Sequence, residues 1–110
     1  MERTNIGNLS PNDLCPLPSL AVADLSYMSL KTAVPILSRL TRPDAGIVCL
    51  VKPLFEVADS NARRTGRLTR SHYHEVLTGL IEYIDSIGLY IAGITRSCIQ
   101  GSSGADEFFM

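Results

Sequence analysis

Two apolar runs decide the fold: Leu20-Ala21-Val22-Ala23, which is followed by Asp24, and Ile47-Val48-Cys49-Leu50-Val51, which is followed by Lys52. Uninterrupted apolar runs of this length are typical of strands that are buried on both faces, as in a parallel sheet. The carboxyl ends of neighbouring parallel strands lie about 4.8 Å apart at one edge of a sheet, so we expect Asp24 and Lys52 to pair there. This pair is the main chemical clue in the sequence.

Helical periodicity separates and follows the two runs. Ser29 is a predicted N-cap for a helix with apolar residues at helical spacing from Leu30 to Leu40, in which Pro35 forces an irregular first turn or a kink. A second helix is predicted to begin at Ser71 and to stop at Gly88. Its apolar stripe has steps of three and four residues: Tyr73, Val76, Leu77, Leu80, Ile81, Ile84 and Ile87.

The remaining segments complete an alternating pattern. Residues 1–18 are polar and rich in Pro and Asn, which predicts an extended leader, and residues 19–110 carry the folded unit. We further predict a strand over 89–95, a Gly/Ser loop over 100–105 and a terminal strand over 107–110. This order favours an open α/β sheet, whose ligands bind beyond the carboxyl ends of the strands.

Composition excludes several classes of protein. The chain has 110 residues, enough for one domain, and ten basic residues against eleven acidic ones exclude a global electrostatic grip on nucleic acid or anionic lipid. No apolar run approaches the roughly 20 residues of a membrane span, and the N-terminus lacks a signal-peptide layout, so we expect a soluble cytoplasmic protein. The three widely spaced cysteines favour reduced thiols and no metal site.

A polar segment over residues 58–70 is predicted to be a mobile loop. It carries Arg63, Arg64 and Arg67, whose guanidinium groups suit RNA phosphates, although a solvated surface loop is the commoner outcome. Taken one by one, Asp24, Lys52 and the late Glu107 also have plain interpretations, as a turn cap, a solvated strand end and an edge residue.

Three segments taken together carry a resemblance. They are 20–30 around Ala-Asp24-Leu-Ser-Tyr, 51–57 with Val-Lys52-Pro-Leu-Phe-Glu-Val, and 97–109 with Gln-Gly101 and Glu107-Phe-Phe. In this order they resemble the hemolysin A branch of the FtsJ-like RNA methyltransferases. The resemblance implies a partial Rossmann-like methyltransferase sheet, mostly parallel with an antiparallel last strand. It also implies methyl transfer from S-adenosylmethionine to a ribose 2′-hydroxyl of ribosomal RNA.

The resemblance assigns roles residue by residue. Asp24, Lys52 and Glu107 match the last three members of the family's catalytic Lys-Asp-Lys-Glu tetrad, and Asp24 and Asn5 match cofactor contacts. The first lysine and the glycine-rich cofactor loop have no counterpart here, so the chain matches the C-terminal half of such a domain. We therefore expect weak or absent binding of S-adenosylmethionine and no methyl transfer by this chain alone.

The same comparison predicts an unprotected sheet edge. In the family, further strands lie beside the strand at 20–23, so here this strand becomes an exposed apolar edge that favours self-association. The alternative to an enzyme part is therefore a non-catalytic α/β interaction module. Membrane lysis, which the family name suggests, is disfavoured because the helical stripe is needed to cover the sheet and its polar face is not basic.

Overall fold

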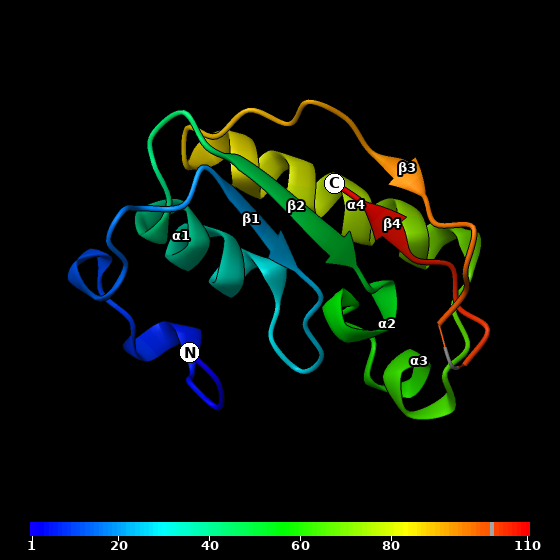
Figure 1. The fold of residues 1–110 in the computed structure, drawn as a ribbon. Coiled ribbons are helices and arrows are strands. Elements are labelled where there is room, and N and C mark those ends of the chain that lie inside the picture. The colour runs from blue at the N-terminus through cyan, green and yellow to red at the C-terminus, as the bar shows by residue number, and fades with distance from the viewer. Residues whose placement is uncertain (102) are drawn as a thin grey trace.

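The computed structural model describes residues 1–101 and 103–110, so Ser102 of the predicted Gly/Ser loop lies outside the described residues. It contains a four-stranded sheet in the order β1-β2-β4-β3 (Figure 1). The strands are β1 (Leu20–Ala23), β2 (Gly46–Val51), β3 (Thr95–Arg96) and β4 (Phe108–Phe109). The pair β1–β2 is parallel, whereas β2–β4 and β4–β3 are antiparallel. The chain is thus a mixed α/β unit, with a smaller parallel share than expected.

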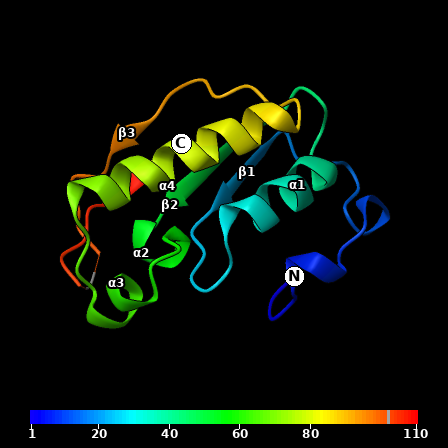
Figure 2. The same cartoon turned by 180° about the vertical axis from the view of Figure 1, so that it is seen from behind.

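Two long helices cover one face of this sheet, as Figure 2 shows from behind. They are α1 (Leu30–Leu40) and α4 (Arg70–Ser86). The Ser29 hydroxyl accepts from the Lys31 N–H, which confirms the predicted cap of α1. Helix α4 begins one residue earlier than predicted, because Thr69 is its N-cap, and it stops before Gly88, whose φ of 79° suits glycine.

The prediction of a loop over 58–70 is wrong in part. Residues Ser60–Thr65 form the short helix α3, which follows another short helix, α2 (Pro53–Glu56). The Asp59 side chain accepts from the N–H groups of Asn61 and Ala62, and Gly66 ends the helix with a φ of 69°. A strong cap at each end therefore stabilises one turn and a half of helix in a segment without apolar periodicity.

The predicted strand over 89–95 is also wrong over most of its length. Only Thr95 and Arg96 pair, and their partners are the two residues of β4. Met110, which follows β4, exchanges two backbone hydrogen bonds with Cys49 of β2. Residues 89–94 have no strand neighbour among the described residues, and a strand is defined by its partner. A cavity of about 640 Å³ lies between this segment and β2. The terminal strand predicted over 107–110 is confirmed in shorter form as β4.

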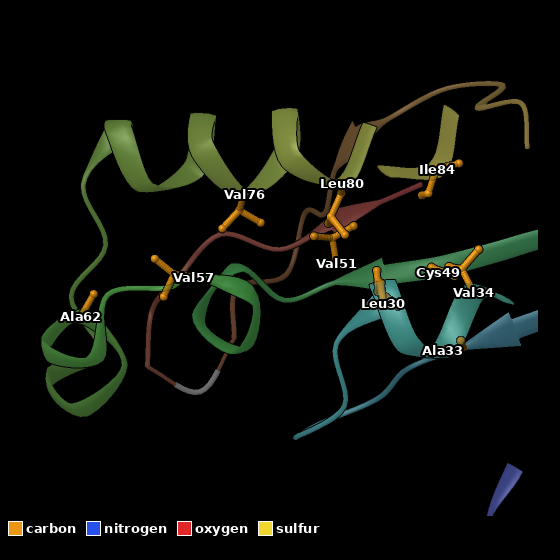
Figure 3. Packing of buried hydrophobic residues seen from close by; sticks show 11 residues of the cluster. Leu30, Ala33, Val34, Cys49, Val51, Val57, Ala62, Val76, Leu80 and Ile84 are labelled. Carbon is orange, nitrogen blue, oxygen red and sulfur yellow. The ribbon is translucent and has the colours of Figure 1, made fainter. Parts of the chain in front are cut away.

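The core lies between the sheet and the two long helices. Leu80 of α4 points toward Val51 of β2, and both are almost completely buried (Figure 3). Val57 and Ala62 extend the cluster toward α3. Burial of aliphatic side chains at such positions is the main stabilising contribution in a unit of this size.

The other face of the sheet is uncovered by the described residues, which corrects the expectation of strands buried on both faces. Val22 is 73% exposed and its neighbour in register, Val48, is 39% exposed. Leu20 and Phe109 are exposed as well. We call these four residues the open face. β1 also lies at the edge of the sheet, and its second side has no partner among the described residues.

The leader over 1–18 contains two single turns of 3-10 helix, η1 (Ile6–Asn8) and η2 (Pro11–Asp13), and no strand. Helix α1 lies beside η1. Within the part of the chain that the structure describes, no helix combines the length and the apolar character that a membrane crossing requires.

Candidate functional site

The site begins with an ion pair at the carboxyl ends of β1 and β2. These strands are parallel and in register, with Ala23 opposite Cys49, so the residues that follow them emerge at the same edge. Lys52 Nζ lies 2.5 Å from Asp24 Oδ1. The Lys52 side chain is 17% exposed, whereas that of Asp24 is 64% exposed. The expected pairing is present, and it holds the ammonium group at the end of a mostly buried side chain.

Glu107 reaches the same end of the sheet from the distant end of the chain. It precedes β4, and its backbone carbonyl accepts from the Ser97 N–H at 2.8 Å. The next anchor is the Asp106 N–H, which donates to the Tyr73 hydroxyl at 3.0 Å. Lys52 and Glu107 line one cavity of about 50 Å³. The structure thus brings Asp24, Lys52 and Glu107 together at the carboxyl edge of the sheet, and we call these three residues the rim. No ion pair joins Glu107 to Lys52 among the described residues.

Gly101 makes room for the Glu107 carboxylate. A Cβ atom at position 101 would lie 2.7 Å from Glu107 Oε1, which is closer than real Cβ contacts come. A side chain there would push the carboxylate out of its present place. The glycine of the Gln-Gly segment therefore leaves the space that the Glu107 carboxylate occupies.

Glu56, the acidic residue of the Phe-Glu-Val segment, links α2 to the loop that follows β1. Its carboxylate accepts from the Ser29 hydroxyl at 2.6 Å and from the Leu30 N–H at 2.7 Å. An anionic group at this position also interacts favourably with the N-terminal end of the α1 dipole. The acidic residue of α2 thereby fixes the start of α1, just after the loop that carries Asp24.

Two aromatic residues beside the ion pair were also missed. The Tyr27 ring meets the Phe55 ring edge to face, with centroids 5.2 Å apart and planes at 64°. Tyr27 follows Asp24 by three residues, and Phe55 follows Lys52 by three residues. The equal spacing after two neighbouring strands is the sequence signal that could have revealed this contact.

The predicted RNA-binding arginines lie on and after α3. Arg63, Arg64 and Arg67 are all exposed. Arg63 donates to the Ala58 carbonyl, and Arg64 donates to the Asn61 side chain at 2.8 Å. Helix α3 lies near α2, which follows Lys52 directly (Figure 1). The guanidinium groups therefore belong to the same end of the molecule as the rim.

Asn5 does not join the rim. It lies in the leader, where its side chain accepts from the Gly7 N–H at 2.9 Å and caps η1. No hydrogen bond links it to Asp24 among the described residues. Its predicted contact with a cofactor stays a prediction, and in this structure the side chain is engaged in a local turn.

The cavity at the predicted catalytic residues is smaller than a typical ligand pocket. The cavity beside Lys52 and Glu107 measures about 50 Å³, whereas ligand pockets usually measure about 300–1,000 Å³. The larger cavity, between β2 and residues 88–93, contains none of the predicted site residues. The described part of the chain also contains no cluster of three or more potential metal ligands.

The buried thiol offers no alternative chemistry. Cys49 is 1% exposed, and its burial raises the pKa of the thiol to about 11, so it stays protonated at neutral pH. A thiolate is the nucleophilic form of cysteine. Cys49 is therefore a core residue of β2.

Relatives of known sequence match the whole chain. A protein named "Putative rRNA methyltransferase YqxC" from Bacillus subtilis is 32% identical over 112 residues, which cover 100% of this chain and 40% of the relative. The 16S/23S rRNA (cytidine-2′-O)-methyltransferase TlyA of Mycobacterium tuberculosis is 33% identical over 111 residues, 100% of this chain and 41% of that protein. The chain thus spans about two fifths of the length of these curated relatives. No family model matches the sequence.

Solved structures agree with the sequence relatives. "Putative hemolysin from Streptococcus thermophilus" superimposes with a TM-score of 0.90 at 32% identity, over 99% of this chain and 40% of its own. A protein of the same description from Lactococcus lactis gives 0.90 at 26% identity, over 99% of this chain and 53% of its own. By sequence and by fold, this chain is similar to the C-terminal part of the TlyA and YqxC relatives and of the solved putative hemolysins.

Proposed function

We propose that the chain carries the catalytic rim of an S-adenosylmethionine-dependent rRNA ribose 2′-O-methyltransferase, within one half of a Rossmann-like sheet. The observation that supports this most directly is the Asp24–Lys52 ion pair at the carboxyl edge of two parallel strands, with Glu107 on the same small cavity. Ligands of open α/β sheets bind beyond this edge. Relatives that bear the name rRNA methyltransferase match the chain over its entire length.

The rim suits the activation of a ribose hydroxyl. In this reaction the new C–O bond would form as the bond between methyl and sulfur of S-adenosylmethionine breaks, with S-adenosylhomocysteine as the leaving group, and a positioned group would take up the hydroxyl proton. Lys52 Nζ is the candidate acceptor: its ammonium would first give up a proton to solvent, and the resulting amine would take up the hydroxyl proton while Asp24 holds it in place from the neighbouring strand. Glu107 lines the same cavity and supplies the second acidic group of the rim. Holding the hydroxyl among fixed groups lowers the entropic part of the barrier.

We propose further that this chain is inactive alone. The cavity that Lys52 and Glu107 line measures about 50 Å³, and the chain spans about two fifths of the length of its relatives. A segment equivalent to the part of the relatives that this chain does not match would complete the crevice. The test is to mix the chain with the segment of the Bacillus subtilis relative that it does not match, and to measure transfer of a labelled methyl group to rRNA.

Lys52→Ala and Lys31→Ala form a matched pair for this test, because they are the two lysines of the chain. Lys31 lies on α1, where its ammonium stands 5.9 Å from the Tyr83 ring centroid. We expect methyl transfer in the mixture alone, a loss of about 100-fold or more in Lys52→Ala and little change in Lys31→Ala. Equal activity of both variants would exclude Lys52 from the reaction.

A non-catalytic interaction module is the second candidate. The exposed open face and the unpaired edge of β1 favour it, because exposed apolar strands at a sheet edge pair readily with other chains. Calorimetric titration with S-adenosylmethionine separates the two functions. Heat of binding in the completed mixture, and none with the chain alone, supports the enzyme; no heat in either supports the module.

A further inference from the structure

The further inference starts from the larger cavity, which measures about 640 Å³ and contains none of the rim residues. Its two walls are residues 46–49 of β2 and residues 88–93, the segment that leads from α4 toward β3. Met110 also lines it, and in Figure 1 the end marked C lies between the two walls. We call this cavity the slot. Its volume falls within the range of about 300–1,000 Å³ that is usual for ligand pockets.

The slot continues in line with β4. This strand pairs with β2 on one side and with β3 on the other. After β4, Met110 still exchanges two backbone hydrogen bonds with Cys49, at 2.8 and 3.0 Å. Beyond this pair, residues 46–48 of β2 have no partner on the β4 side among the described residues. The slot therefore prolongs a position in the sheet that already holds one strand.

The β2 wall presents backbone groups to the slot. The N–H and C=O groups of Cys49 face β4, since both bond to Met110. Backbone groups two residues apart along a strand point to the same side, so those of Ile47 face the slot. No described residue bonds to them there. Unpaired backbone groups of a strand are a template for pairing with a further strand.

The opposite wall offers groups of the same kind. The Ser97 N–H faces β4, because it donates to the Glu107 carbonyl at 2.8 Å. At the strand period of two residues, Gly93 and Ile91 are the residues of this wall that we expect to face the slot. There is open space beside Gly93, where an added Cβ atom would have no contact within 4 Å. A strand in the slot would thus find hydrogen-bonding groups on both sides.

The register also determines which side chains suit the slot. Residues directly opposite each other in a sheet share a face, and Cys49, which is buried, lies on the face that the helices cover. Ile47 lies on the same face, two residues earlier. A residue opposite Ile47 would therefore meet Val34 of α1 and Ile84 of α4, which line the slot and are each 4% exposed. Its neighbours in sequence would lie on the uncovered face, where polar side chains are tolerated.

We propose that the slot binds an extended segment of another polypeptide by β-strand addition, antiparallel to β2 and with an apolar side chain at every second residue. In this mode of recognition, main-chain hydrogen bonds supply affinity and pockets for alternate side chains supply specificity. The slot combines the two, with backbone groups along its walls and an apolar floor formed by the helices. The rim does not take part, so this site is independent of methyl transfer.

The experiment uses the 110-residue chain and the peptide acetyl-Ser-Leu-Ser-Leu-Ser-Lys-amide, whose Lys side chain carries fluorescein. Fluorescence polarisation measures its Kd. We expect saturable binding, and binding weaker by about tenfold or more when both Leu residues of the peptide are replaced by Ser. N-methylation of the first Leu, or of the Ser that follows it, removes one N–H donor from the peptide. Each change should weaken binding about 5- to 150-fold, because a strand in the slot is bonded on both sides.

Hydrogen exchange locates the bound peptide on the protein. At saturation, the peptide should slow the exchange of the Ile91 and Gly93 amides by about tenfold or more. The amide of Ala92, which lies between them and faces away from the slot at the period of two, is the matched control and should change little.

Three results would overturn the proposal. The first is the absence of saturable binding, and the second is unchanged exchange of the Ile91 and Gly93 amides in the presence of the peptide. The third is full affinity of either N-methylated peptide, because a sheet edge such as that of β1 bonds a partner on one side only and tolerates N-methylation at alternate residues. The protein sequence is the same in every arm, so misfolding cannot produce any of these results.

Discussion

Removal of the Glu56 carboxylate should destabilise the chain by an amount that the structure allows us to work out. Glu56 accepts two hydrogen bonds, from the Ser29 hydroxyl at 2.6 Å and from the Leu30 N–H at 2.7 Å. A net hydrogen bond to a charged group contributes about 1.5–3 kcal/mol, and an anion at a helix N-terminus contributes about 0.3–1 kcal/mol. The carboxylate is only partly buried, so we take the lower end of both ranges.

We therefore expect Glu56→Ala to lower the free energy of unfolding by about 3 kcal/mol. Glu56→Gln keeps the shape and can accept from the Leu30 N–H, but it loses the charge, so a loss of about 1–2 kcal/mol is expected. Glu75→Ala is the matched control, because Glu75 is exposed on α4, and its loss should stay within about 0.5 kcal/mol.

Urea unfolding followed by far-ultraviolet circular dichroism measures these differences. With a slope of about 2 kcal/mol per molar, Glu56→Ala should move the midpoint down by about 1.5 M. A shift for Glu56→Ala no larger than that for Glu75→Ala would refute the view that Glu56 fixes the start of α1. A urea midpoint of Glu56→Gln equal to that of the parent chain would show that the charge of Glu56 contributes nothing to stability.

Four further predictions concern other parts of the chain. The N–H groups of Ala62 and Asn61 donate to the Asp59 carboxylate and lower its pKa, so its contribution to stability is present above about pH 4 and is lost as the pH falls through the lowered pKa. In thermal melts, Asp59→Asn should therefore have a lower melting temperature than the parent at neutral pH and an equal one in strong acid. Ellman's reagent should modify two thiols of the native chain and spare Cys49, and all three should react in denaturant. In hydrogen exchange, the amides of residues 90–94 should exchange much faster than those of β2, and equal protection would reveal a strand partner. Val22→Lys should reduce any self-association seen by sedimentation velocity, because it places a charge on the edge strand.

The local elements follow from the sequence, because each depends on residues close together in the chain. The strand Leu20–Ala23 has the predicted bounds, α1 begins after its predicted cap, and α4 begins one residue before its predicted start, whereas the short helix α3 was not predicted. The Asp24–Lys52 pair could also be predicted from the sequence, because two apolar strands that each end in a charge need only be parallel neighbours to bring the charges together.

Tertiary structure decided the rest, because pairing and covering depend on segments far apart in the chain. The apolar pattern at 89–94 predicts a strand, but this segment has no strand partner among the described residues. Val22 is exposed because no described residue covers its side of the sheet. The approach of Glu107 to Lys52 across 55 positions depends on the anchor that Tyr73 provides from α4. Sequence periodicity states which face of an element is apolar; the fold alone determines what that face meets.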